Sequence, residues 1–155
     1  MPTPKSQIKI DKNGIKYESN LDACEYYLFE LTRGALRDVA KFVKREFRTN
    51  YYSHFRRMSG DAGKSVSANV WSSANTKYPR VELGLKAGKD DGFYAYFQEF
   101  GTAKNDVPRL GILQHAVQDN VDEIVKIESM YLSAIDSNPE SLIDESETEI
   151  EGDEE

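Results

Sequence analysis

The stretch LDACEYYLFELTRGALRDVAKFVKREFRT, residues 21–49, decides the expected architecture. Apolar residues recur along it at steps of three or four, with one longer step, and therefore mark one face of a helix. Asn20, directly before the stretch, is a residue type that caps helix N-termini well. We therefore predict a helix that is about 43 Å long if it is unbroken to Thr49, with Gly34 as a place for a kink or close packing. Its apolar stripe consists of Leu21, Cys24, Leu28, Leu31, Ala35, Val39, Phe42 and Phe47.

Two segments with alternating apolar and polar residues follow this helix and predict a pair of strands. The loop-forming residues 59–63 precede them, and the turn-rich SSANTKYP between them predicts a long, exposed hairpin tip. In FYAYFQEF, residues 93–100, the periodicity does not distinguish a strand from a helix. The apolar strand positions are Val66, Ala68, Val70, Val81, Leu83 and Leu85.

A second amphipathic helix is predicted from Pro108, because proline favours the first helical turn. Its apolar positions run from Leu110 to Ile135, and Asn138-Pro139 ends it. The order helix, strands, helix predicts an α+β fold. In this fold a long N-terminal helix and a C-terminal helix pack on a small, mainly antiparallel sheet.

The length of 155 residues favours a single domain, here over residues 21–135. Residues 1–20 are expected to form an N-terminal arm with a short hairpin around Asn13-Gly14. Residues 136–155 hold ten acidic residues, no Lys or Arg and few apolar residues, which predicts a disordered acidic tail. The net charge of −7 thus combines this tail with a body of 20 basic and 17 acidic residues, a net of +3.

Several classes of protein are disfavoured by what the sequence contains. No apolar run approaches the roughly 20 residues that span a bilayer, and no signal peptide is recognisable, so we expect synthesis in the host cytoplasm and no membrane partner. Cys24 is the only cysteine. His54 and His115 have no metal-ligand spacing around them, and phosphate-binding and nucleophile motifs are missing. We therefore expect no catalytic residue, no metal and no cofactor.

Two features leave alternatives open. Glu99, between Phe97 and Phe100, would suit general acid chemistry if buried, although no partner group is identifiable. The stretch 33–57 has eight Lys or Arg against two acidic residues, with aromatic residues near its end. It is interpreted as a solvated helix face, a protein contact or a nucleic-acid-binding face. Its residues on the predicted helix are Arg33, Arg37, Lys41, Lys44, Arg45 and Arg48.

The segment YAYFQEFGTAKNDVPRLGILQHAV, residues 94–117, resembles the signature of phage tail-completion proteins, which join head to tail in long-tailed phages. A weaker similarity in GDAGKSVSANV extends the resemblance over residues 21–135. Ala62 and Arg109 depart from the family pattern, which favours Thr and an aromatic residue there. The resemblance rests on Tyr94, Ala95, Glu99, Phe100, Gly101, Thr102 and Pro108.

The motif has a physical interpretation without catalysis. Gly101 can adopt a positive φ where a β-carbon would be strained. Thr102 is expected to hydrogen-bond local backbone, and Glu99 is expected to accept bonds from loop N–H groups. Phe97 and Phe100 are expected to anchor the segment in the core.

The resemblance implies a non-catalytic virion protein that forms a homo-oligomeric ring, expected to be a hexamer, at the neck between head and tail tube. Its implied partners are further copies of itself, the head-proximal neck or adaptor proteins and the tail tube protein. Genomic DNA would pass through the lumen without specific binding. The alternative function is a small nucleic-acid-binding protein that uses residues 33–57.

The surfaces expected to make contacts are the N-terminal arm, the basic helix face and the hairpin tip from Trp71 to Pro79. In the tip, Lys77 and Tyr78 are the further candidates. Trp71 is the best single anchor, since a lone Trp often contributes much binding energy, with core packing as its alternative. The acidic tail is expected to keep the lumen from binding DNA or to dock on a basic neighbour.

Overall fold

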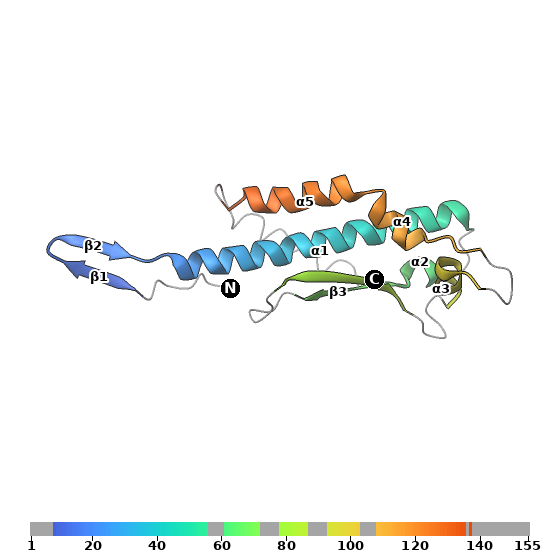
Figure 1. The fold of residues 1–155 in the computed structure, drawn as a ribbon, viewed down its shortest axis with the longest axis horizontal. Coiled ribbons are helices and arrows are strands. Elements are labelled where there is room, and N and C mark those ends of the chain that lie inside the picture. Colours follow the sequence, from blue (N-terminus) through green and yellow to red (C-terminus); the bar gives the residue numbers. More distant parts are fainter. Residues whose placement is uncertain are drawn as a thin grey trace.

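The computed structural model describes residues 8–55, 61–71, 78–86, 93–102, 108–135 and 137. Its helices and strands confirm the α+β class, and a single long helix forms the axis of the molecule (Figure 1). None of the helices in these ranges is long and apolar enough to cross a membrane. The predicted acidic tail lies, apart from Ser137, outside the described residues. The elements are β1 (Lys9–Lys12), β2 (Ile15–Glu18), α1 (Leu21–His54), α2 (Asp61–Lys64), β3 (Val66–Trp71), β4 (Arg80–Leu85), α3 (Phe93–Phe100), α4 (Ile112–Gln118) and α5 (Val121–Ser133).

Helix α1 begins where predicted and continues five residues beyond Thr49, to His54. The capping role expected of the Asn20 side chain is wrong, because it makes no cap hydrogen bond; instead the Asn20 carbonyl accepts a bond from the Cys24 N–H at 3.0 Å. Helices α4 and α5 lie along one side of α1, and the β3–β4 sheet lies along the other (Figure 1). The C-terminal helices therefore pack on α1, which separates them from the sheet.

Two buried clusters hold these layers together. The larger one joins the C-terminal half of α1 to the sheet, α3 and α4, and the smaller one joins the middle of α1 to α5 and the residue after it. The members of the larger cluster are Val39, Val43, Phe47, Tyr51, Val66, Ala95, Ile112 and Ala116. The members of the smaller cluster are Leu31, Ala35, Tyr131 and Ala134.

The predicted apolar stripe of α1 is only partly buried. Its central residues enter the two clusters, but Leu21, Cys24 and Leu28 at its N-terminal end are exposed, so their expected place on a buried face is wrong. The reason is visible in Figure 1: the N-terminal turns of α1 extend past the ends of α5 and the β3–β4 sheet.

Strands β3 and β4 form the predicted antiparallel hairpin. Its register places every apolar strand position opposite another one: Val66 faces Leu85, Ala68 faces Leu83, and Val70 faces Val81. Directly opposite residues share one face of a sheet, so all six side chains lie on one side. Residues 72–77, which include Lys77 and most of the predicted tip, lie outside the described residues.

The prediction of one C-terminal helix from Pro108 is wrong in two respects. Pro108 precedes the helix, which starts only at Ile112 because Gly111 adopts a left-handed conformation with φ of 59°. The helix then breaks after Gln118. At this break the Asn120 side-chain amide donates a hydrogen bond to the Ala116 carbonyl at 3.0 Å, ending α4 and allowing α5 to follow α1 in a new direction.

Two segments are helical although the sequence did not predict a helix there. A loop was expected before the first strand, and for residues 93–100 the periodicity did not distinguish a strand from a helix. Residues 61–64 form the short helix α2, and residues 93–100 form α3. Gly63 in α2 approaches α1 so closely that a β-carbon there would lie 2.5 Å from Tyr52 Oη and 2.7 Å from two carbons of the Tyr52 ring. Close packing therefore accounts for glycine at this position.

Candidate assembly surfaces

The Glu-Phe-Gly-Thr segment forms a corner between α3 and α4. Glu99 is buried, with 5 % of its surface exposed, although it carries a carboxylate. One of its oxygens accepts a hydrogen bond from the Leu113 N–H at 2.8 Å, and the other accepts one from the Gln114 N–H at 3.1 Å. Both N–H groups belong to the first turn of α4, where backbone donors lack partners within the helix. Glu99 thus attaches α3 to the start of α4.

The backbone strengthens this corner. The Leu110 N–H donates to the Gln98 carbonyl at 2.9 Å, and the Gly111 N–H donates to the Glu99 carbonyl at 3.2 Å. Gly101 has the expected positive φ, 73°, and its N–H donates to the Phe97 carbonyl at the end of α3. The bonds expected of Glu99 are therefore present, but their donors lie in the first turn of α4 instead of the turn at Gly101.

Other expectations for the motif are wrong. Thr102 Oγ1 is buried and has no hydrogen-bond partner among the described residues, where a bond to local backbone was expected. Phe100 is 55 % exposed and Phe97 is half-buried, so Phe100 does not anchor the core. Of the remaining motif residues, Ala95 is buried in the larger cluster, whereas Tyr94 and Pro108 are exposed.

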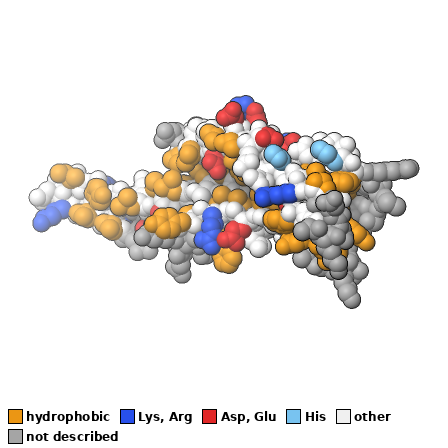
Figure 2. Space-filling view, turned by 45° about the vertical axis from the view of Figure 1, so that its right-hand side comes forward, with side chains coloured by type: hydrophobic (Ala, Val, Ile, Leu, Met, Phe, Trp, Pro, Cys, Tyr) orange, Lys and Arg blue, Asp and Glu red, His pale blue; other side chains and the backbone are white. Residues whose placement is uncertain are grey.

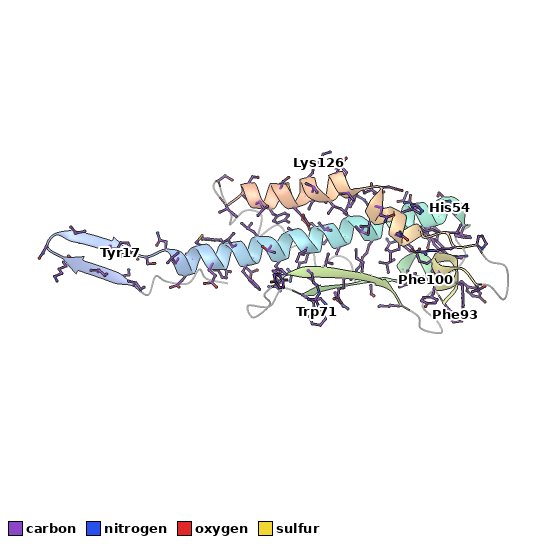
Figure 3. The ribbon with its side chains drawn as sticks, in the orientation of Figure 1. Tyr17, His54, Trp71, Phe93, Phe100 and Lys126 are labelled. Atoms are coloured by element: carbon purple, nitrogen blue, oxygen red, sulfur yellow. The ribbon has the colours of Figure 1, made fainter. Side chains whose placement is uncertain are left out.

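The exposed aromatic residues of α3 form one surface, which includes Phe100, a residue expected in the core. The rings of Tyr96 and Phe100 lie 4.8 Å apart, and those of Phe93 and Phe97 lie 4.6 Å apart. Figure 3 shows Phe93 and Phe100 beside α3, at the end of the molecule far from β1 and β2. The members of this aromatic surface with at least two-fifths of their area exposed are Phe93, Tyr94, Tyr96 and Phe100.

Three of the six basic residues on this face of α1 lie beside acids on the same helix. Arg33 lies 3.5 Å from Glu30, and Lys41 lies 3.7 Å from Asp38. Arg45 lies 3.6 Å from Glu46, and its guanidinium also lies over the Phe42 ring at 5.3 Å. Arg37 and Lys44 are half-buried and Arg48 is exposed. Within the described part of the stretch, this distribution is typical of a solvated helix face.

Trp71 lies outside the core, which removes its core-packing alternative. Its side chain is 49 % exposed on the face of the sheet opposite the apolar one. The indole N–H donates to Glu82 at 3.2 Å, and the Arg80 guanidinium lies 5.4 Å from the ring while bonding Glu82 at 2.8 Å. The hydrogen bond from Arg80 is also the main cause that lowers the pKa of Glu82. Tyr78, beside this cluster, is 69 % exposed.

The two histidines, which are distant in the sequence, line one cavity of about 390 Å³ between α1 and α4. His54 Nδ1 lies 2.9 Å from the Asn50 carbonyl, and His115 Nδ1 lies 3.7 Å from Asp119. The described residues contain no group of three or more side chains that could hold a metal ion. No local sequence pattern indicates that the two histidines converge, because their proximity depends on the packing of α4 against α1.

The N-terminal arm is a regular two-stranded hairpin. Asn13 and Gly14 both have positive φ, as the predicted Asn-Gly turn requires. The register pairs Lys9 with Glu18, whose side chains form an ion pair of 2.8 Å. All eight strand residues are exposed, and Figure 1 places the hairpin beyond the N-terminal end of α1.

Comparisons of the chain with protein-family models, curated proteins and solved structures gave no match. The resemblance to tail-completion proteins therefore rests on the two quoted sequence segments.

Proposed function

We propose that this chain is a non-catalytic structural protein of a phage particle, a tail-completion protein that forms a ring at the neck between head and tail tube. The observation that carries the proposal is the exposed hairpin at the N-terminal end of α1. Ile15 and Tyr17 on it are 73 % and 54 % exposed. An isolated two-stranded hairpin is only marginally stable in water, so this one is expected to gain stability from a partner.

A ring requires contacts between two different surfaces of neighbouring copies. The molecule offers apolar surface at both ends, with the β1–β2 hairpin at one end and the aromatic surface of α3 at the other (Figure 3). Exposed apolar surface of this kind is typical of protein contacts. The hairpin would therefore join copies head to tail by docking on a different surface of the next copy, and the aromatic surface would remain available to a neck or tail-tube protein.

The position of Glu99 supports a structural role for the motif. Both of its carboxylate oxygens accept backbone hydrogen bonds that fix the start of α4. A general acid must present its proton to a substrate. The motif is therefore better explained as a corner that orients α3 and its aromatic surface.

The proposal is tested by negative-stain microscopy and mass determination of the full-length protein, alone and mixed with purified tail tubes. Rings, or caps on one end of the tubes, are the expected result. A protein that stays monomeric at every concentration and leaves both tube ends bare would overturn the proposal.

One observation supports the alternative function, binding of nucleic acid: six Lys and Arg residues are aligned along α1. Residues 1–135, without the acidic tail, are the appropriate protein for its test. Binding to phosphates would weaken steeply as salt increases. Because three of the six aligned cations lie beside acidic side chains on the helix, we expect no tight, salt-dependent DNA binding, and finding it would favour the alternative.

A further inference from the structure

The β1–β2 hairpin has two faces of opposite character. Residues directly opposite each other in the register share a face, and neighbours along a strand alternate. The register pairs Ile10 with Tyr17 and Lys12 with Ile15, so these four share one face, and Ile8 lies two residues before Ile10. The other face carries only charged side chains, namely Lys9, Asp11, Lys16 and Glu18.

This amphipathic pattern is typical of a strand pair that covers a core, yet the apolar face is open. Ile8, Ile10, Ile15 and Tyr17 are each more than half exposed. Figure 2 shows hydrophobic side chains along this end of the molecule and over the first turns of α1. Since the burial of apolar surface is favourable, an occupant that covers this face would gain binding free energy.

The hairpin is joined closely to the start of α1 and lies beyond the end of the helix (Figure 1). The Ser19 N–H donates to the Ile8 carbonyl at 3.0 Å, so hydrogen bonding between the two ends of the hairpin extends to Ser19. The Asn20 carbonyl already accepts the first helical bond, from the Cys24 N–H. No spare residues therefore remain between hairpin and helix for the chain to fold back along α1.

An apolar groove lies on the body between α1, α5 and the start of β4. It has a volume of about 220 Å³. Leu28 and Leu132 on it are 43 % and 61 % exposed, so it is open to solvent. The apolar residues that matter for docking are Leu28, Leu31, Leu36, Pro79, Leu132 and Ile135.

The groove and the hairpin face match in length and in charge. The groove extends along α1 from Leu28 to Leu36, or about 12 Å at the helical rise per residue. A four-residue strand is about 13 Å long. The one charged residue on the β1–β2 face is Lys12, and among the described residues the one charged residue that lines the groove is Glu128.

We infer that the apolar face of the β1–β2 hairpin docks into the α1–α5 groove of a second copy of this chain, with Lys12 placed near Glu128. The inference rests on the proposed self-assembly and names the surfaces that produce it. Donor and acceptor are different surfaces, so each copy can give a hairpin to one neighbour and receive one from another. Such a contact is heterologous and forms a closed ring where the rotation between copies permits closure.

Disulfide crosslinking between two differently labelled proteins tests this contact directly. Both carry Cys24→Ser, which removes the only native thiol. One adds Tyr17→Cys and the other adds Leu132→Cys, both at exposed positions. After mild oxidation we expect covalent dimers in the mixture and only background in either protein alone. The matched control replaces Tyr17→Cys by Lys16→Cys, on the charged face of the same strand, and should lose the dimer.

Charge exchange gives a second test. Lys12→Glu or Glu128→Lys alone should reduce the yield of crosslinked dimer, and the two variants in contacting copies should restore it. The control exchanges the charges of the Lys9–Glu18 ion pair on the other face of the hairpin, as Lys9→Glu combined with Glu18→Lys, and should leave the yield unchanged.

Other outcomes of the crosslinking experiment would contradict the inference. Equal dimer from the Lys16→Cys control, dimer from Tyr17→Cys alone, or an intrachain crosslink when both cysteines are in one chain would overturn the inference. Wild-type rings with no Tyr17–Leu132 crosslink would also overturn it, while leaving the proposed ring function intact. A wild-type protein that stays monomeric and ignores tail tubes would overturn both.

Discussion

The hydroxyl of Tyr131 on α5 donates a hydrogen bond of 2.5 Å to the carboxylate of Asp38 on α1, across 93 residues of sequence. The Tyr131 side chain is almost fully buried in the smaller cluster. Its hydrogen bond with Asp38 is partly buried and joins α5 to α1. Asp38 also lies 3.7 Å from Lys41. One acidic side chain of α1 thus both neutralises a neighbouring lysine and fixes the position of the C-terminal helix.

Tyr131→Phe is expected to lower the free energy of unfolding by about 1 kcal/mol, the usual contribution of such a hydrogen bond. The ring would still fill its place between Leu31 and Ala35, so the loss reports the hydroxyl alone. Urea denaturation at neutral pH measures it. Asp38→Asn and the double variant complete a mutant cycle, and strictly additive effects would show that the two groups do not interact.

Much of this fold follows from apolar periodicity. The middle of α1 and the β3–β4 pair were predictable because their apolar residues repeat at the helical or strand period and pack on partners inside the chain. The break at Asn120 was not, because the apolar repeat continues across it and only the side-chain bond to Ala116 ends the helix. Helix α4 starts at Ile112, later than predicted, because Gly111 adopts a left-handed conformation. The prediction placed the start at Pro108 because proline favours the first helical turn.

The candidate surfaces were less predictable than the fold. The alternation of residues 8–18 predicts a hairpin, but nothing in it shows whether the apolar face has a partner within the chain. Phe97 and Phe100 were expected in the core because aromatic residues are usually buried, whereas α3 has aromatic residues on more than one face and Phe100 is exposed. The partners of Glu99 lie 14 and 15 residues away, beyond any local pattern.

Gly63→Ala is expected to destabilise the protein, because the new methyl group would lie 2.5 Å from Tyr52 Oη and force the ring to move. Overpacking of this kind costs about 1–3 kcal/mol. Thermal or urea unfolding measures the change. Gly84→Ala is the matched control, since a β-carbon there meets nothing within 4 Å, and it should be neutral or slightly stabilising. Equal losses for the two variants would contradict the packing explanation for Gly63.

Glu99→Ala is expected to lower the free energy of unfolding by about 3 kcal/mol, because two backbone donors at the start of α4 lose a charged acceptor. Glu99→Gln should lose less, since its remaining carbonyl oxygen can still accept one of the bonds. Hydrogen exchange of the Leu113 and Gln114 amides should accelerate in both variants. A Glu99→Ala protein with wild-type stability and unchanged exchange would contradict the corner role.

Tyr51 makes stability depend on alkaline pH. Burial raises the pKa of its hydroxyl above the ordinary value of 10.0, and Tyr52 adds to this, while the hydrogen bond to Gln98 at 2.5 Å opposes it. Below the ordinary value both folded and unfolded states keep the proton. Above it the unfolded state releases the proton first, so this contribution to stability is lost as the pH rises from 10.0 through the folded pKa.

Tyr51→Phe should therefore have two effects. At neutral pH the free energy of unfolding should fall by about 1 kcal/mol, because the bond to Gln98 is lost. Above pH 10 its stability should decline less steeply than that of the wild type, because one buried hydroxyl no longer titrates. Urea midpoints across the alkaline range measure both. Tyr94→Phe, at a position 76 % exposed, is the control and should keep the wild-type slope, whereas an equally reduced slope in both variants would assign the effect to tyrosines in general.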